Sequence, residues 1–164
     1  MKISKLGEFG LIDRIKEHFP AYTKDVIAGI GDDTAVVKSP GKGKYLLLTT
    51  DTLVENVHFS LKYARFYELG WKLMAVNLSD IAAMGGSPKY ALVTLGLKKD
   101  LSVSNIEEFY RGIKALARKY NVEVVGGDIV RSPKSLFFTM DVIGYAGKVI
   151  ERSGVGADTD ARGW

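Results

Sequence analysis

Three stretches of the chain carry apolar residues at helical spacing, at 7–20, 66–84 and 102–120. The last of them has one continuous apolar stripe, and Ser104 and Glu107 are spaced as a capping box near its start. The stripe consists of Val103, Ile106, Phe109, Ile113, Leu116 and Tyr120. The segment 66–84 is apolar on almost all sides. We therefore expect three helices, of which the second is buried.

Shorter apolar runs lie between these helices and are typical of strands. They cover 34–38, 44–50, 89–97, 122–128 and 135–147. We expect a turn at Gly41–Gly43 to join the first two runs, and the fourth run to end in a turn at Gly126 and Gly127. The order is then helix, two strands, helix, strand, helix, two strands. It predicts an α/β or α+β fold in which helices cover a mixed sheet.

Composition narrows the classes of function. The 164 residues are 46% hydrophobic, which is enough for one domain with a core of ordinary size. The net charge of +4 suits an anionic ligand such as a nucleotide, but the lysines are too scattered to indicate a nucleic-acid surface. Cysteine is absent, so disulfides and thiolate metal sites are excluded. No segment has the length of a signal peptide or of a membrane span, so we expect a cytoplasmic protein without a membrane partner.

Aspartates recur at the ends of the apolar segments. They are Asp32, Asp33, Asp51, Asp80 and Asp128. Residues at strand ends tend to gather at one edge of a sheet, and clustered carboxylates disfavour each other's ionisation unless a cation neutralises them. Mg²⁺ prefers oxygen ligands of this kind and keeps waters and substrate phosphates around it. The hydroxyl groups of Thr49, Thr50 and Ser79 would be suitable oxygen neighbours.

Taken singly, each of these aspartates except Asp80 is more readily explained as a turn former or a helix cap. Asp80 differs because it shares one helical face with Leu73, Asn77 and Met84. The opposite side of that helix carries Trp71, Ala75, Leu78 and Ala82. With both sides apolar, Asp80 needs a partner. That partner is either a metal ion or a structural one, such as an arginine or backbone donors.

Two further features bear on the chemistry. The stretch "GKGKY" at 41–45 lacks the spacing of a phosphate-binding Walker loop, and we interpret it as a hairpin turn. The chain has two histidines. His58 follows the strand that carries Asp51 after a short loop, which makes it a candidate for substrate contact. His18 is interpreted as a cation at the C-terminus of a helix.

The motifs together resemble one enzyme family. They are "GEFGLID", "GIGDDTAVV", "TTDTLVENVHF", "AVNLSDIAAMG", "GGDIVRS" and "ERSG", in this order. Residues 5–154 resemble the thiamine-monophosphate kinase family, which belongs to an ATP-binding superfamily with aminoimidazole ribonucleotide synthetase, selenophosphate synthetase and a hydrogenase-maturation protein. The motifs "DTLVENVHF" and "NLSDIAAMG" favour the thiamine branch.

The resemblance implies transfer of the γ-phosphoryl group of ATP to thiamine monophosphate, which gives thiamine diphosphate. It implies a homodimer whose sheets pair, and direct in-line transfer without a phosphoenzyme. The Mg²⁺ ligands that it implies are Asp33, Thr49, Thr50, Asp51, Asp80 and Asp128. The contacts that it implies are His58 to thiamine monophosphate, Gly127, Asp128 and Arg152 to ATP, and Tyr110 near the nucleotide base. Asn77 and Ser79 are left with supporting or packing roles.

The chain also departs from the family pattern. A full member is about twice as long, and its second half supplies further contacts to Mg²⁺, ATP and thiamine. We expect residues 1–150 to form an N-terminal domain that binds ATP and Mg²⁺ and dimerises, and 151–164 to be the start of a linker and a disordered tail. The isolated chain is expected to bind Mg²⁺–nucleotide weakly and to turn over poorly or not at all. The alternatives are another ATP-dependent synthetase or maturation enzyme of the superfamily, or a non-catalytic nucleotide-binding and dimerisation module.

Overall fold

The computed structural model describes residues 3–19, 21–41 and 44–148. The predicted turn at Gly41–Gly43 lies partly outside these residues, and Arg152 and the predicted tail lie wholly outside them. The elements of the described part, in chain order, are α1 (Ile3–Glu17), β1 (Val26–Ala28), β2 (Ala35–Lys38), β3 (Tyr45–Val54), α2 (Phe66–Ala83), β4 (Ser87–Leu97), α3 (Val103–Tyr120), β5 (Glu123–Arg131) and β6 (Phe137–Ala146).

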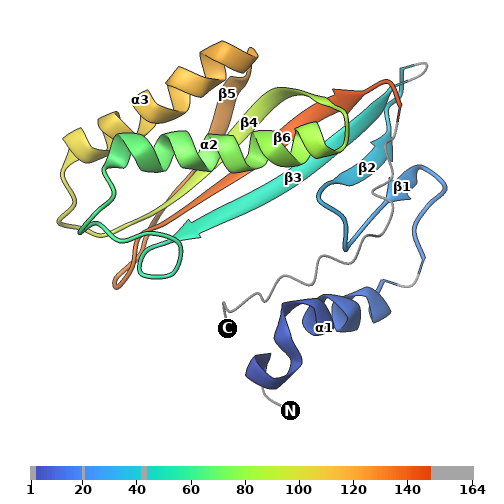
Figure 1. Cartoon of the computed structure of the whole chain (residues 1–164), viewed down its shortest axis with the longest axis horizontal. Coiled ribbons are helices and arrows are strands. Elements are labelled where there is room, and N and C mark those ends of the chain that lie inside the picture. The colour runs from blue at the N-terminus through green and yellow to red at the C-terminus, as the bar shows by residue number, and fades with distance from the viewer. Residues whose placement is uncertain (1–2, 20, 42–43, 149–164) are drawn as a thin grey trace.

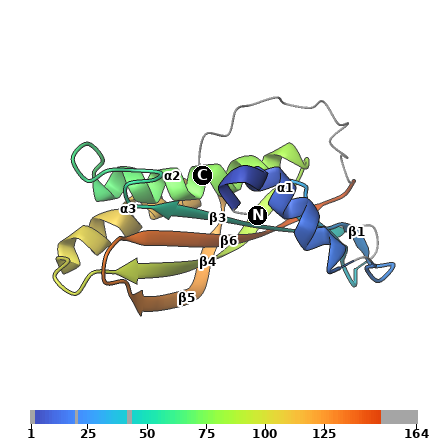
Figure 2. The same cartoon turned by 90° about the horizontal axis from the view of Figure 1, so that it is seen from below.

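The strands form one mixed sheet in the order β1-β2-β3-β6-β4-β5. Only β4 and β5 are parallel, because α3 returns the chain to the starting end of β4, and the other neighbours are antiparallel. Helices α2 and α3 lie side by side over one face of the sheet, and no helix of the described residues covers the face on the other side (Figures 1 and 2). The predicted α+β fold with a mixed sheet is confirmed, with β1 as one strand that the pattern did not predict.

The core lies between the sheet and the two helices. Side chains alternate strictly between buried and half-buried along β6, as expected for a central strand with one covered face. Phe138 of β6 sits among three aromatic rings, with its ring centroid 4.4 Å from Phe109, 5.7 Å from Phe59 and 6.5 Å from Phe66. The covered face is therefore tied together by one aromatic cluster.

Two glycines set how closely the helices approach. A Cβ atom on Gly70 of α2 would lie 1.9 Å from the carbonyl oxygen of Phe109, and one on Gly112 of α3 would lie 1.9 Å from that of Tyr67. The two backbones are thus in direct contact at reciprocal points. Any larger side chain at either position would have to push the helices apart.

The predicted turn at Gly126 and Gly127 is wrong. Strand β5 runs through both glycines, which pair with Leu92 and Val93 of β4. At Gly127 the φ angle is 155°, and a Cβ atom there would lie 1.9 Å from the carbonyl oxygen of Val93. Gly127 therefore allows close approach between strands inside the sheet, a role that sequence spacing does not distinguish from a turn.

The predicted capping box of α3 is also wrong. The helix begins at Val103 after Ser102, and no side-chain hydrogen bond caps it. The hydroxyl groups of Ser102 and Ser104 instead lie 2.7 Å apart and share a hydrogen bond. The apolar stripe is buried only in its middle, since Val103 is 74% exposed and Tyr120 46% exposed. The helical period identifies the inward face but not how far the neighbouring elements reach along it.

The predicted full burial of α2 and the packing of α1 need correction as well. Leu73, Asn77 and Met84 of α2 are buried, but Trp71 on the other side is 46% exposed. Helix α1 lies apart from α2 and α3 (Figure 1), and its Phe9 is 66% exposed. None of the helices in the described residues combines the length and the apolar character needed to cross a lipid bilayer.

Candidate functional site

Helix α2 brings Asp80 against strand β3. The hydroxyl group of Thr49 donates to the Oδ2 atom of Asp80 at 2.9 Å, and it also lies 3.3 Å from the carbonyl oxygen of Asp33. Thr49 is buried, on the face of β3 that the helices cover. A helix, a strand and a loop thus meet at one hydroxyl group. Thr49 is therefore one partner of Asp80.

The loop before β2 reaches this point because β2 begins only at Ala35, opposite Leu48 of β3. Within the described residues, β2 pairs with residues 45–48 of β3, and no strand pairs with the rest of β3 on that side. The loop with Asp32 and Asp33 occupies the space beside it. Gly31 takes a φ of 110°, which an L side chain rarely adopts, and the carboxylate of Asp32 accepts from the backbone N–H of Asp33 at 2.8 Å. Asp32 is therefore a turn former, while Asp33 lies next to Thr49.

A cavity of about 560 Å³ opens at this junction. Four of the six predicted metal ligands line it, namely Asp33, Thr49, Thr50 and Asp80. The remaining wall is largely apolar and comes from the end of α1, the loop that follows it, and strands β1, β2 and β3. The hydroxyl oxygen of Thr34, which also lines the cavity, is buried and has no hydrogen-bond partner in the described structure. Oxygen atoms from several segments therefore face one space.

The carboxylates at this site disfavour one another's charge. Burial, followed by the charge of the neighbouring Asp80, raises the pKa of Asp51 to about 6. Burial also raises the pKa of Asp80, and the charge of Asp33 acts in the same direction, while the hydrogen bond from Thr49 opposes it. Ionised carboxylates crowded in this way are stabilised by a cation.

The donor set fits a hard divalent cation. The described residues contain no group of three or more His, Cys, Asp or Glu side chains arranged to hold a metal ion. Mg²⁺ does not require one, since proteins usually bind it through one or two carboxylates while waters and substrate phosphates complete its shell. Asp80 on the cavity wall, and Asp51, which lies beside Asp80 but does not line the cavity, would supply the two carboxylates, and Thr49 would supply a neutral oxygen.

Ser79 and Asn77, which lie close to Asp80 in the sequence, do not line the acidic cavity. Ser79 is exposed on α2 and lines a different cavity, between α2 and the end of α3. Asn77 is fully buried, and its amide donates to the carbonyl oxygen of Leu73 at 2.9 Å. Asn77 thus has the supporting role predicted for it, and Ser79 does not lie at the acidic cavity.

Asp128 lies apart from the other aspartates. One row of the sheet runs from Asp51 through Met140 and Val93 to Gly127, the residue before Asp128. Strands β6 and β4 stand between, so the separation is about three strand spacings of roughly 4.8 Å each. The carboxylate of Asp128 accepts from the backbone N–H of Ile129 at 2.8 Å. The sheet topology thus separates the metal ligands predicted from the resemblance into two groups.

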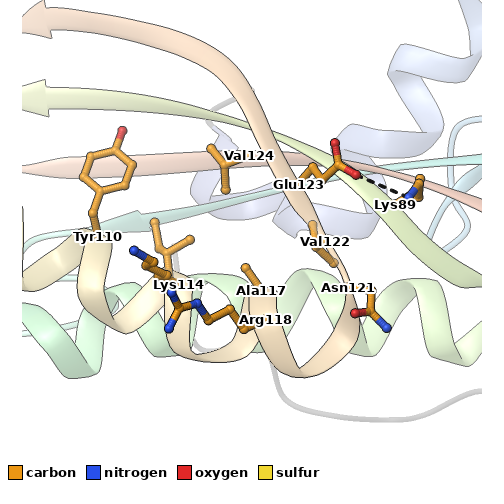
Figure 3. Close-up of a pocket in the computed structure, with 10 residues that line it drawn as sticks. Lys89, Tyr110, Lys114, Ala117, Arg118, Asn121, Val122, Glu123 and Val124 are labelled. Carbon is orange, nitrogen blue, oxygen red and sulfur yellow. Dashed lines mark hydrogen bonds and ion pairs between the residues drawn. The ribbon is translucent and has the colours of Figure 1, made fainter.

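A second cavity, of about 750 Å³, lies between α3 and β5 and contains Tyr110 (Figure 3). Burial raises the pKa of the Tyr110 phenol. Lys114 and Arg118, four residues apart on α3, also line this cavity, and an ion pair of 3.4 Å between Lys89 and Glu123 closes one end of it. Sequence reasoning missed these cations. Their spacing on one face of a strongly amphipathic helix was the available signal.

His58 stands on the loop that follows β3. Its Nδ1 atom accepts a hydrogen bond of 3.0 Å from the backbone N–H of Val54, and the backbone N–H of His58 donates to the carbonyl oxygen of Val54 at 2.8 Å. With Nδ1 as the acceptor, the proton of the neutral imidazole lies on Nε2. The exposed side chain can therefore donate a hydrogen bond to an anion.

Comparisons with known proteins agree on one family. Residues 31–146 match the family described as AIR synthase related protein, N-terminal domain. The chain is 44% identical over 154 residues to thiamine-monophosphate kinase of Aquifex aeolicus and 40% identical over 139 residues to that of Bacillus subtilis. These matches cover 94% and 85% of the chain, but only 47% and 42% of the relatives.

A solved structure, "AaThiL complexed with AMPPCP and TMP", superposes with a TM-score of 0.81 at 43% identity. The match covers 92% of this chain and 45% of that one. The chain thus spans about half the length of the proteins it matches, and the resemblance to the N-terminal half of thiamine-monophosphate kinases is confirmed. The chain belongs to the family of AIR synthase related proteins, whose N-terminal domain it carries.

Proposed function

We propose that this chain is the nucleotide- and metal-binding half of a kinase that transfers the γ-phosphoryl group of ATP to thiamine monophosphate. One observation carries the proposal: Asp33, Thr49, Thr50 and Asp80 converge on one cavity in a fold that superposes on a structure complexed with AMPPCP and TMP. Its cytoplasmic location, and the lack of a nucleic-acid or membrane partner, stay predictions.

The acidic cavity is the proposed site of Mg²⁺. Asp51 and Asp80 would bind the ion, with Asp33, Thr49 and Thr50 beside it. Bound there, Mg²⁺ would neutralise phosphate oxygens and the charge that develops during transfer. The protein's own contribution is to hold three carboxylates close together, so that the charge of Asp33 raises the pKa of Asp80 and the charge of Asp80 raises the pKa of Asp51. Bringing in the ion relieves this repulsion between the carboxylates.

The edge of the sheet next to α3 is the proposed place of the nucleotide. Gly127 and Asp128 would lie beside the phosphates, and Tyr110 beside the base. Tyr110 shares its cavity with Val124, three residues before Gly127 on the same strand, so one ligand can reach both. Lys114 and Arg118 add positive charge to that cavity, which suits a polyanion. Arg152, the remaining predicted contact to ATP, lies outside the described residues.

A homodimer would bring the two groups of predicted metal ligands, Asp128 and the residues around Asp80, together in one assembly. Within one chain, β6 and β4 separate Asp128 from Asp51. No helix of the described residues covers one face of the sheet (Figure 2). By strand alternation and register, two exposed apolar side chains lie on that face, Leu92 of β4 and Val130 of β5. An apolar surface of this kind favours association, and a second copy of the chain is the proposed partner.

The proposed chemistry needs no strong base. An oxygen of the acceptor phosphate attacks the γ-phosphorus of ATP while the bond from that phosphorus to the leaving ADP oxygen breaks. The acceptor is largely ionised at neutral pH, because the second pKa of a phosphate monoester is about 6. No proton has to be removed first, and no protein group is phosphorylated. His58 would hold the acceptor through its Nε2–H group. Because the acceptor is already ionised, no nucleophile–base pair is needed among the candidate residues.

Calorimetry tests the proposal. Mg²⁺ with AMPPCP, a non-transferable ATP analogue, is titrated into the chain first, and thiamine monophosphate is titrated into the resulting complex. We expect both ligands to bind, and His58→Ala to weaken only the second. His18→Ala is the matched control, since this other exposed histidine lies at the end of α1. Binding of the nucleotide alone would favour another enzyme of the superfamily. Binding of neither ligand would overturn the proposal.

A further inference from the structure

Glu55 is the one charged residue among the buried residues of the described chain. It is 8% exposed, at the point where β3 has just ended. A buried carboxylate is costly unless it is paired and hydrogen-bonded. Its Oε2 atom lies 2.6 Å from the Nζ atom of Lys98 and accepts from the backbone N–H of Leu136 at 2.9 Å. Burial alone would raise the pKa of Glu55, but these two partners outweigh it and lower that pKa.

Glu55 and its two partners come from three strand ends. Glu55 follows β3, Lys98 follows β4, and Leu136 precedes β6. The backbone joins the same junction, because the N–H of Glu55 donates to the carbonyl oxygen of Leu136 at 2.9 Å. Glu55 is thus held on both its main chain and its side chain. Removal of its charge would loosen this end of the sheet without touching the acidic cavity.

The loop that Glu55 begins is the loop that carries His58. It closes over five residues, with a bridge between Glu55 and Phe59 and a hydrogen bond of 2.7 Å from the N–H of Asn56 to the carbonyl oxygen of Phe59. Asn56 takes the left-handed conformation, with φ of 65°. Phe59 anchors the far end of the loop in the core, on Phe138. Between these two anchors His58 turns its Nδ1 atom back to Val54.

We propose that Glu55 is a positioning residue for His58. By fixing the start of the loop, it keeps the imidazole in the tautomer in which Nδ1 accepts from Val54 and Nε2 carries the proton. The part played by Nε2 in holding a phosphate rests on the proposed function. The positioning itself does not, because it concerns only the loop and its contacts within the chain.

The test is the ¹⁵N chemical shifts of the two imidazole nitrogens of His58, measured by NMR at a pH about two units above the ordinary histidine pKa of about 6.5. The chain has two histidines, and His18 serves as an internal reference. We expect one tautomer in the wild type, and a mixture of the two in Glu55→Gln. Glu8→Gln is the matched control, since Glu8 is an exposed carboxylate on α1.

Two further measurements separate positioning from general destabilisation. Lys98→Met keeps the carboxylate but removes its cation, and we expect it to shift the His58 resonances in the same direction while leaving those of His18 unchanged. Thiamine monophosphate should bind Glu55→Gln about tenfold more weakly than wild type, the factor that corresponds to one hydrogen bond to a charged group.

The outcomes are distinct. His58 resonances that stay at their wild-type positions in both Glu55→Gln and Lys98→Met, in a folded protein, would overturn the positioning role. If neither wild type nor variant binds thiamine monophosphate, the proposed function fails, and the NMR result still decides whether Glu55 positions His58. If binding falls equally in Glu8→Gln, the effect is not specific to Glu55 and the proposal is wrong.

Discussion

Asp51 and Asp80 place two carboxylates where only one can be ionised without cost. Burial and the charge of Asp80 raise the pKa of Asp51 to about 6, and burial together with Asp33 raises the pKa of Asp80. A hydrogen bond from Thr49 offsets part of the cost on Asp80. This arrangement does not stabilise the fold by itself. The proposed Mg²⁺ would stabilise it, because each carboxylate is attracted to the cation.

Replacing Asp80 by Asn should therefore weaken the binding of Mg²⁺–nucleotide much more than it weakens folding. The amide keeps an oxygen for the Thr49 hydroxyl group but removes the charge. We expect the dissociation constant for Mg²⁺–AMPPCP to rise by at least about tenfold and the free energy of unfolding to change by less than about 1 kcal/mol. Calorimetry and urea denaturation measure the two quantities.

Asp100→Asn is the control for this change, because Asp100 is an exposed carboxylate in the loop after β4. It should alter neither quantity. If Asp80→Asn lowers the stability and leaves nucleotide binding intact, then Asp80 is a structural residue whose partner is Thr49 alone.

The lowered pKa of Glu55 predicts that the folded chain loses stability in acid. Its pKa is lowered in the folded chain, so its contribution is present above the ordinary value of 4.5 and is lost as the pH falls through the lower folded value. Glu55→Gln should cost about 2 kcal/mol at neutral pH, the magnitude for a buried hydrogen bond to a charged group. The difference from wild type should shrink as the pH falls below 4.5.

Urea denaturation at a series of pH values measures this difference. Glu123→Gln, on the exposed Lys89–Glu123 pair, should show a small difference at every pH, because exposed ion pairs contribute little. A Glu55→Gln difference that stays constant from neutral pH to acid would mean that the charge of Glu55 contributes nothing to stability.

At the scale of elements, the packing of α2 on α3 decides how the helix carrying Asp80 sits on the sheet. Gly70 and Gly112 bring the two backbones into contact, and each lies where a methyl group would overlap a carbonyl oxygen of the other helix. Helix propensity taken alone favours alanine over glycine by about 1 kcal/mol. Overpacking at a rigid backbone contact costs about 1–3 kcal/mol or more. The second effect should win.

Gly112→Ala should accordingly destabilise the fold by at least about 1 kcal/mol, despite the better helix propensity of alanine. Thermal denaturation followed by circular dichroism measures the change. Gly147→Ala is the control, because no atom lies within 4 Å of the Cβ position there. A stabilised Gly112→Ala variant would show that the two helices can separate at low cost, and the close approach would then not hold Asp80 in place.

At the scale of the whole molecule, the uncovered face of the sheet and the apolar strand β5 predict a dimer. Leu92 on β4 is 39% exposed between the buried Ala91 and Val93, so its side chain lies on the uncovered face. Leu92→Lys should shift the chain from dimer to monomer, because a lysine charge would be buried unpaired at the interface. Sedimentation velocity measures the oligomeric state.

Val103→Lys is the control for the dimer prediction. Val103 is 74% exposed at the start of α3, on the other side of the sheet from the uncovered face, and its replacement should leave sedimentation unchanged. A wild-type chain that sediments as a monomer at all concentrations would remove the proposed partner. The two groups of predicted metal ligands would then have to act separately.

The sequence by itself determined most of the elements and the family. Helical and alternating periods located all three helices and five of the six strands, since burial of one face leaves its period in the pattern. The order of Asp33, Thr49, Asp51 and Asp80 along the chain, together with the flanking motifs, was enough to identify the family. These features are local, so the residue pattern carries them.

Tertiary structure decided what depends on neighbours distant in the chain. The sequence pattern did not predict the pairing of Gly127 with Val93, because a glycine pair signals a turn and a close approach of strands equally well. It also did not predict that two strands separate Asp128 from Asp51, or that Glu55 meets Lys98 and Leu136. Strand order and buried ion pairs are fixed by the packing of the whole chain. The sequence shows which residues have suitable chemistry, and the fold shows which of them lie in contact.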